Sequence, residues 1–250
     1  MRILLTNDDG INALGLRELA EVLSEFAEVY IAAPAFEQSG TGHGITVHSP
    51  IRVNEVIYPV VVSAAWAVQG LPADCVKLAL DNLLDSPPDI IVSGINHGAN
   101  LGTDVIYSGT VSGALEGLIN GLPSIAVSVT DGKSNFELAA RTAAKLCRAW
   151  EKANFQPKTM LNVNVPPEVK GMRYAALGDR KYVEAFDERI DPRGGKYFWL
   201  HGVVADGIQD ADTDVELSKE GYITVTPIQF DLTNRAVLDE LLNGGGLGSL

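Results

Sequence analysis

The chain has few cysteines and no long apolar run. Only two of its 250 residues are cysteines, Cys75 and Cys147, and their spacing does not match any metal-binding cysteine motif. This favours buried free thiols in a reducing compartment. No stretch reaches the roughly 20 apolar residues of a membrane span. Acidic residues follow the first short apolar run too closely for a signal peptide. We therefore expect a soluble, cytoplasmic protein that does not act at a membrane.

Basic residues are also scarce. The 19 Lys and Arg are outnumbered by 32 Asp and Glu, which gives a formal net charge of -13. Such a charge argues against binding a nucleic-acid polymer through its backbone. It does not exclude a small phosphorylated ligand, because a bound divalent cation reverses the local sign of charge.

The usual nucleotide-cofactor motifs are missing. The first turn has no G-x-G-x-x-G pattern, and no G-x-x-x-x-G-K-[ST] occurs anywhere in the chain. These absences argue against a dinucleotide-dependent oxidoreductase and against a P-loop NTPase.

Apolar strand patterns alternate with helical spacing through the first two-thirds of the chain. This alternation predicts parallel βαβ units in an α/β fold with a doubly wound, mostly parallel sheet. Buried strands are expected at residues 3–6, 29–33, 90–93, 125–129 and 160–165, and one or two irregular strands within 45–62. Helices are expected at about 16–26, 76–84, 111–118 and 137–152.

The pattern changes after Pro166 and Pro167, where short strands are expected at 174–177, 197–200 and 222–226. We expect a core at residues 1–167 and a β-rich C-terminal region at 168–250, with a hairpin turn at 193–196. A projecting hairpin cannot bury both faces alone, so it either pairs with another subunit or stays exposed to solvent. Residues 236–242 predict a last helix, and the chain from 244 predicts a flexible tail.

The most informative segment is the first strand, which leads directly into Asn7-Asp8-Asp9-Gly10. A regular strand points adjacent side chains to opposite faces, whereas a turn containing glycine can bring both carboxylates together. Two adjacent carboxylates remain ionised most easily around a cation, which predicts a divalent-metal site where open α/β sheets bind ligands. Ordinary turn chemistry, with Asp9 capping the next helix, is the alternative.

Polar loops follow the other strands and converge on the same edge of a doubly wound sheet. They contain Ser39, Gly40 and Asn96, while Asn12 lies in the loop after the first strand. Carboxylate, hydroxyl and amide oxygens suit Mg²⁺, Mn²⁺ or Ca²⁺. Ser108-Gly109-Thr110 opens a helix, whose free N–H groups form an anion site, unless Ser108 or Thr110 is only a helix cap. A cation beside such a site predicts metal-assisted phosphoryl chemistry.

Several blocks of sequence together resemble the SurE (stationary-phase survival protein) family of metal-dependent 5′/3′-nucleotidases. They include Leu4 to Ile11 with its Asn-Asp-Asp-Gly turn, and the Tyr-Ser-Gly-Thr-Val motif that begins at Tyr107. Further blocks lie at 34–40, 70–76, 93–100, 162–166, 213–214, 221–227 and 231–233. Their correct order over most of the chain is far more specific than any one motif.

The resemblance implies that Asp8, Asp9, Ser39 and Asn96 bind one divalent cation per subunit, namely Mg, Mn or Ca. It implies a Rossmann-like core and an extended C-terminal part that exchanges between subunits of a homodimer or homotetramer. The implied substrates are nucleoside 5′- and 3′-monophosphates and, for some members, short polyphosphate.

We therefore expect hydrolysis of a phosphomonoester by a water molecule activated at the metal. The expected catalytic residues are Asp8, Asn12 and Asn96, and the expected phosphate-binding residues are Gly40, Asn96, Ser108, Gly109 and Thr110.

Two rival functions share the acidic turn. A phosphatase that forms an aspartyl-phosphate needs a second acid two residues after its nucleophile, where this chain has Gly10. A receiver-type, Mg²⁺-binding signalling module needs an acceptor aspartate at the end of a middle strand, where this chain has Ser93-Gly94.

Overall fold

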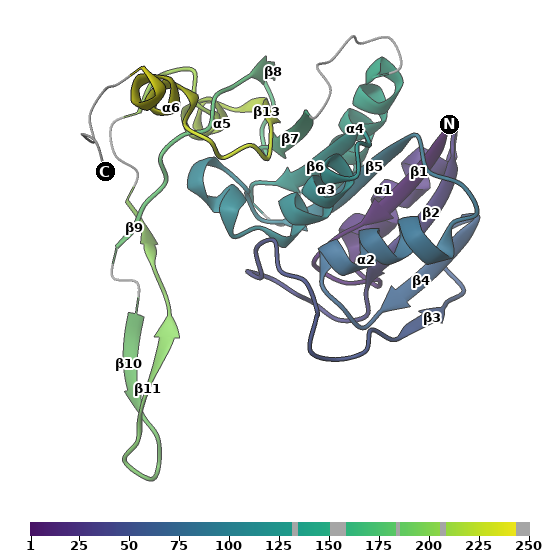
Figure 1. Cartoon of the computed structure of the whole chain (residues 1–250), viewed down its shortest axis with the longest axis horizontal. Coiled ribbons are helices and arrows are strands. Elements are labelled where there is room, and N and C mark those ends of the chain that lie inside the picture. Colours follow the sequence, from purple (N-terminus) through teal and green to yellow (C-terminus); the bar gives the residue numbers. More distant parts are fainter. Residues whose placement is uncertain (132–134, 151–158, 184–185, 206–208, 244–250) are drawn as a thin grey trace.

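A nine-stranded sheet forms the centre of the molecule (Figure 1). The computed structural model describes residues 1–131, 135–150, 159–183, 186–205 and 209–243. The strand order is β3-β4-β2-β1-β5-β6-β7-β13-β8. These strands are β1 (Arg2–Thr6), β2 (Glu28–Pro34), β3 (Val53–Glu55), β4 (Ala64–Val68), β5 (Ile90–His97), β6 (Ser124–Val129), β7 (Met160–Val165), β8 (Gly171–Tyr174) and β13 (Tyr222–Ile228).

Six neighbouring strands, from β4 to β7, run parallel, which confirms the expected doubly wound α/β fold. The chain winds outward from β1 through β2 to β4, then crosses back to β5 and continues through β6 to β7. The winding direction therefore reverses between β1 and β5. The carboxyl ends of strands at such a switch point border the crevice in which α/β proteins bind ligands.

Helices cover both faces of the sheet. On one face α1 (Leu14–Ser24) packs against α4 (Phe136–Trp150), and on the other α2 (Pro72–Leu78) packs against α3 (Gly109–Ile119). Successive residues of β1 alternate between these layers, because Ile3 and Leu5 join the α1 cluster while Leu4 joins the α2 cluster. All three side chains are fully buried, so the strand that leads to Asp8 is held from both sides.

Three predicted segments differ from the structure. The irregular strand region yields only β3, whereas β4 lies just beyond it and pairs with β2 along its whole length. The strand predicted at 90–93 continues to His97, and the loop after it contains a 3-10 helix, η2 (Gly102–Ile106). The strand predicted at 174–177 is shifted, since β8 ends at Tyr174 and Ala176 forms only an isolated bridge.

The C-terminal region both extends the sheet and projects from it. β13 pairs antiparallel with β7 and parallel with β8. β10 (Phe186–Ile190) and β11 (Lys196–Leu200) form the predicted hairpin, which extends far from the sheet in Figure 1. Its base is the short pair β9 (Tyr182–Val183) and β12 (Val203–Val204).

The remaining helices are η1 (Ala79–Leu83), which continues α2 as a π-helix, α5 (Asp214–Lys219) and α6 (Arg235–Leu242). The expected tail from residue 244 lies outside the described residues. Cys75 and Cys147 are buried and free, as expected. Within the described ranges, no helix combines the length and apolarity that a bilayer crossing requires.

Candidate active site

The turn after β1 is closed by its own first side chain. Asn7 is completely buried, donates from its amide to the carbonyl of Gly10 at 2.9 Å, and accepts from the Gly10 N–H at 3.2 Å. Gly10 has a φ of +97°, a conformation that residues with a side chain rarely adopt. This short ring of hydrogen bonds fixes the directions in which Asp8 and Asp9 leave the backbone.

Asp8 is a buried carboxylate that faces the crevice. It is 4 % exposed, and its Oδ1 accepts a hydrogen bond from the hydroxyl of Thr110. Burial raises the pKa of Asp8 to about 6; the Thr110 hydrogen bond opposes this increase and the neighbouring charge of Asp9 adds to it. In the described residues no Lys or Arg forms an ion pair with this carboxylate. A bound cation would compensate its charge.

Asp9 points toward β5. Its Oδ2 accepts from the backbone N–H of His97 at 3.2 Å and lies 3.2 Å from Nδ1 of the same histidine. The His97 ring in turn meets Phe136 edge-on, with ring centroids 4.8 Å apart. His97, the last residue of β5, therefore orients the second carboxylate of the pair.

Two further predicted ligands lie on either side of the turn. Asn96, near the end of β5, donates from its amide nitrogen to the carbonyl of Gly98 at 2.8 Å, so its amide oxygen is the atom that suits a cation. Ser39 is exposed in the loop after β2, and its hydroxyl donates to Glu37 at 2.7 Å.

The loop that contains Ser39 is fixed by two buried carboxylates. His43 Nε2 lies 2.9 Å from Oε2 of Glu116 on α3, and Lys77 also pairs with Glu116, at 3.1 Å. Three residues beyond His43, the backbone N–H and hydroxyl of Thr46 donate to Asp74 of α2 at 2.9 Å and 2.6 Å. The loop is thus tied to the two helices that pack together on one face of the sheet.

The start of α3 lies directly against Asp8. Ser108 is the N-cap residue, because its hydroxyl accepts from the Val111 N–H at 3.0 Å. A Cβ placed on Gly109 would lie only 2.7 Å from Cβ of Asp8. The absence of a side chain at 109 therefore lets the positive end of the helix approach the carboxylate turn.

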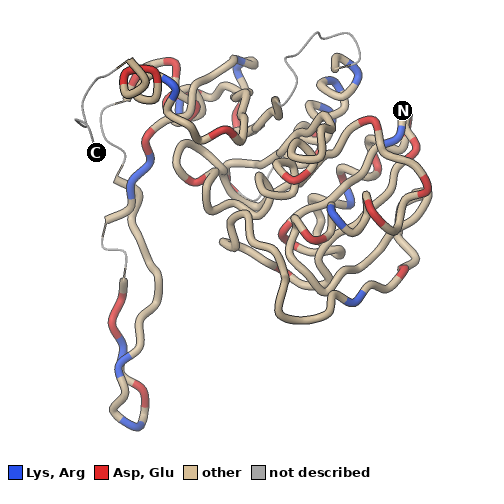
Figure 2. The backbone as a smooth tube through the Cα atoms, viewed as in Figure 1, with Lys and Arg blue, Asp and Glu red and all other residues tan. Residues whose placement is uncertain are grey.

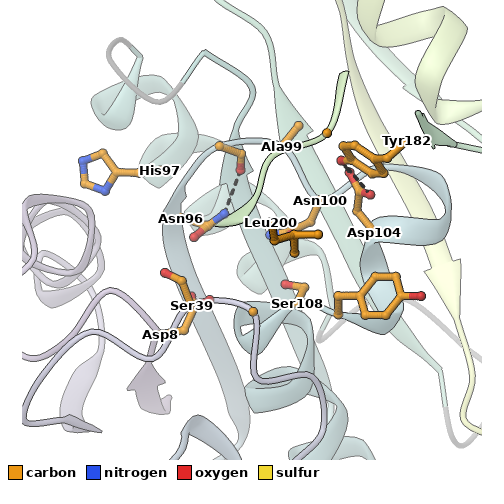
Figure 3. A pocket seen from close by; sticks show the side chains of 14 residues that line it. Asp8, Ser39, Asn96, His97, Ala99, Asn100, Asp104, Ser108, Tyr182 and Leu200 are labelled. Atoms are coloured by element: carbon orange, nitrogen blue, oxygen red, sulfur yellow. Dashed lines mark hydrogen bonds between the residues drawn. The ribbon is translucent and has the colours of Figure 1, made fainter. Parts of the chain in front are cut away.

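A cavity of about 670 Å³ joins these elements. Asp8, Ser39, Gly40, Asn96 and Ser108 line it, so the predicted convergence of the loops is confirmed for these five. In Figure 3, Asp8, Ser39 and Asn96 lie on one side of the cavity, with Tyr182 and Asp104 across from them.

The other predicted residues do not line the cavity. Gly109 and Thr110 lie behind Asp8, and Asp9 lies beside His97. Asn12 is exposed in the turn before α1 and is not part of the cavity wall.

A buried asparagine network under the cavity has no counterpart in the predicted site. The carbonyl of Asn100 accepts from the amides of Asn162 and Asn164 at 2.8 Å and 3.0 Å, and its side chain donates to Ser128 at 2.8 Å. These hydrogen bonds hold Asn100 in the loop after β5. Asn100 also lines the cavity, so the network fixes part of the cavity wall. Two asparagines that alternate within the apolar strand β7 are the sequence signal for it.

The donor set suits a hard divalent cation. In the described ranges, no group of three or more His, Cys, Asp and Glu is arranged to hold a metal, so a cation here would need neutral oxygens beside the two aspartates. Ser39 and Asn96 offer such oxygens at the cavity wall. No Lys or Arg is among the described lining residues, while Asp8 and Asp104 are. A cation bound beside Asp8 would therefore favour the entry of an anionic ligand.

Comparisons with known proteins identify the family of this chain. The family model described as "Survival protein SurE" matches residues 3–184. A protein of Heliobacterium modesticaldum named 5′-nucleotidase SurE is 49% identical over 100% of this chain and 93% of its own. The protein of the same name from Pelotomaculum thermopropionicum is 50% identical over 96% of this chain and 94% of its own.

A solved structure of a protein from the same family has a similar fold. The crystal structure of the SurE protein from Aquifex aeolicus has a TM-score of 0.83 and 35% sequence identity, and the match covers 97% of this chain and 100% of that one. The family model matches well over half of the chain, the relatives match it almost from end to end, and the fold agrees, so this chain belongs to the SurE family.

Proposed function

We propose that this chain is a metal-dependent 5′-nucleotidase that hydrolyses nucleoside monophosphates to nucleoside and phosphate. The central observation is the cavity in which a buried aspartate, Asp8, meets the N-terminus of α3. Relatives that align over nearly the whole chain are named 5′-nucleotidase SurE. The proposal includes 3′-monophosphates and short polyphosphate as further substrates, and the cytoplasm as the site of action.

One divalent cation per subunit, Mg²⁺, Mn²⁺ or Ca²⁺, would be held by Asp8, Asp9, Ser39 and Asn96. When bound, such a cation supplies charge neutralisation, polarisation of a phosphoryl oxygen and a lower pKa for water. Asp8 is central to this set because it faces the cavity without a cationic partner among the described residues.

The substrate phosphate would lie at the start of α3. Ser108 lines the cavity there, and the free N–H groups of the Ser108-Gly109-Thr110 step, together with the helix dipole, favour an anion. Gly40 and Asn96 line the same wall and would orient the phosphate. Thr110 holds Asp8 through its hydroxyl, and Asp8 would accept a proton from the attacking water. Asn12 is left without a role, because it lies outside the cavity wall.

The two rival functions lack the residues they need at these positions. Asp8 is followed two residues later by Gly10, whose backbone closes the turn, so no second acid serves an aspartyl-phosphate. A receiver module would present its acceptor aspartate at the end of a middle strand, whereas β5, Ile90–His97, contains no aspartate.

We also propose that the region from 168 onward serves assembly into a homodimer or homotetramer. Both hairpin strands are exposed and hold large apolar side chains, including Phe186, Phe198 and Trp199. Figure 2 shows acidic and basic residues alternating along the same hairpin. An exposed ribbon of this composition would be covered by exchange with a second copy of the chain. The division of the chain at residue 167 separates two proposed functions and not two folding units, because β8 and β13, which follow it, belong to the central sheet.

Phosphate release provides the test. Wild type, Asp9→Ala and the control Asp81→Ala, which removes an exposed aspartate of η1, are assayed with nucleoside 5′- and 3′-monophosphates. Each assay is run in EDTA and then with excess Mn²⁺ or Mg²⁺. We expect metal-dependent release by wild type and Asp81→Ala, and its loss in Asp9→Ala. Release that persists in EDTA, or no release with any metal, would refute the proposal.

A further inference from the structure

The cavity is much larger than a phosphate group requires. Its volume of about 670 Å³ lies within the range of sites that enclose a whole small-molecule ligand. Beyond the phosphate end its wall includes Asp104, Tyr107, Tyr182, Leu200 and Gly202, to which the proposed chemistry gives no task. Figure 3 shows Tyr182 and Asp104 on the side of the cavity away from Asp8. The space between the two sides is continuous.

The ring of Tyr182 is fixed before any ligand arrives. Its hydroxyl donates to Asp104, with both carboxylate oxygens at 2.9 Å, and Asp104 also pairs with Arg180 at 2.8 Å. Gly202 packs closely against the tyrosine, because a Cβ at 202 would lie 3.0 Å from Cβ of Tyr182 and 3.1 Å from its Cδ1. A planar ring anchored at its tip and at its base loses little freedom when a second ring stacks on it.

Tyr107 is fixed through its backbone. Its carbonyl accepts from the Gly42 N–H at 3.0 Å, and its own N–H donates to the carbonyl of Asp104 at 3.0 Å. The residue directly precedes Ser108, the cap of α3, yet its side chain is 67 % exposed. An aromatic side chain therefore lies one residue from the proposed phosphate position.

Leu200 adds apolar surface from the end of β11, where it is 76 % exposed and lines the cavity. The two carboxylate oxygens of Asp104 are already engaged by Arg180 and Tyr182. With Asp104 engaged, Tyr107, Tyr182 and Leu200 offer rings and apolar surface at this end of the cavity.

We propose that Tyr107, Tyr182 and Leu200 form a base subsite, which binds the purine or pyrimidine of a nucleoside monophosphate by stacking and apolar contact. The inference rests on the proposed function, because it assumes that the phosphate lies at Ser108. Stacking tolerates every base, since each has a π-face. The subsite therefore selects nucleotides over phosphate esters without a base, and discriminates only weakly among the bases.

The experiment compares kcat/KM for AMP, CMP and ribose 5-phosphate, the last of which has the sugar and phosphate but no base. Wild type is measured beside Tyr182→Ala, Tyr182→Phe and Tyr107→Ala. The control is Tyr174→Ala, which removes an exposed tyrosine of β8 outside the cavity wall. Because Tyr107 is exposed, Tyr107→Ala should fold even if Tyr182→Ala does not.

We expect wild type to prefer both nucleotides to ribose 5-phosphate. Tyr182→Ala and Tyr107→Ala should each reduce this preference by about 10-fold to 100-fold, the range for loss of one base–aromatic stack, mainly through KM. Tyr182→Phe should retain most of the preference, because it keeps the ring, and Tyr174→Ala should retain all of it.

Two results would overturn the subsite while leaving a phosphatase in place. One is a wild-type enzyme that hydrolyses ribose 5-phosphate as efficiently as AMP. The other is an unchanged preference in both folded alanine variants. A wild type that releases phosphate from none of the three substrates would instead refute the proposed function, and the subsite with it.

Discussion

Replacing Asp8 by asparagine should stabilise the protein in the absence of metal while removing its activity. Asp8 is 4 % exposed, and burial raises its pKa from the ordinary 3.8 to about 6. The folded protein therefore holds a proton on Asp8 more tightly than the unfolded chain does. This difference opposes folding above pH 6, where the buried carboxyl must ionise.

The magnitude follows from the two pKa values. Their difference corresponds to about 3 kcal/mol of stability lost above pH 6, a loss that declines between pH 6 and 4 and vanishes below pH 4. An asparagine cannot ionise, and its amide oxygen can still accept from the Thr110 hydroxyl. In EDTA at pH 7.5 we expect Asp8→Asn to be more stable than wild type by up to ~3 kcal/mol, or roughly 6–12 °C in Tm.

The assay is urea denaturation of both proteins in EDTA at pH 7.5 and at pH 4.5. The comparison variant is Asp74→Asn, because Asp74 is equally buried but accepts from the Thr46 N–H, the Thr46 hydroxyl and the Leu71 N–H. In Asp74→Asn the side-chain NH2 group replaces one of these accepting oxygens and faces a hydrogen-bond donor. The variant should therefore lose about 1–3 kcal/mol of stability at pH 7.5. The reasoning fails if Asp8→Asn is less stable than wild type at pH 7.5, or if its advantage is the same at both pH values.

Two further substitutions test the geometry around Asp8 and the Ser39 loop. Gly109→Ala places a Cβ 2.7 Å from Cβ of Asp8 and should displace the start of α3 from this carboxylate. We expect kcat at saturating metal to fall by about 100-fold, with an unchanged circular dichroism spectrum. A normal kcat would show that the close approach of α3 to Asp8 is dispensable. His43→Ala breaks the contact with Glu116 and should weaken Mn²⁺ binding about 10-fold in a calorimetric titration, with partial recovery in His43→Gln. Equal affinity in both variants and wild type would mean that His43 does not position Ser39.

Local sequence patterns were sufficient to predict most of the parallel part of the fold. Strands buried on both faces consist mostly of apolar residues, so β1, β2, β6 and β7 were predicted within a residue or two. β4 was missed because Ala64-Ala65-Trp66-Ala67-Val68 is rich in alanine, a helix former. It becomes a strand because it pairs with β2 from Tyr30 to Pro34, a contact that local propensity cannot reveal.

The cavity wall was predictable where its residues lie at or beyond the carboxyl ends of the parallel strands. Asp8, Ser39, Asn96 and Ser108 all line the cavity, since the carboxyl ends of parallel strands share one edge of the sheet. Tyr182 reaches the same cavity from far along the chain, through its contact with Asp104. No periodicity relates those two positions, so only the folded structure could bring the aromatic wall to the site.

The glycines of α3 explain how these parts are held in register. Gly109, Gly113 and Gly117 repeat at every fourth residue, and a Cβ at the last two would lie 2.7 Å from Thr6 and 2.5 Å from Ile91. Each glycine costs about 1 kcal/mol of helix stability relative to alanine. In return, the helix lies directly on β5 and β6 and comes close to Thr6, the last residue of β1. Bulkier residues would lift α3 from the sheet and move its N-terminus away from Asp8, so the position of the proposed phosphate site depends on packing along the whole helix.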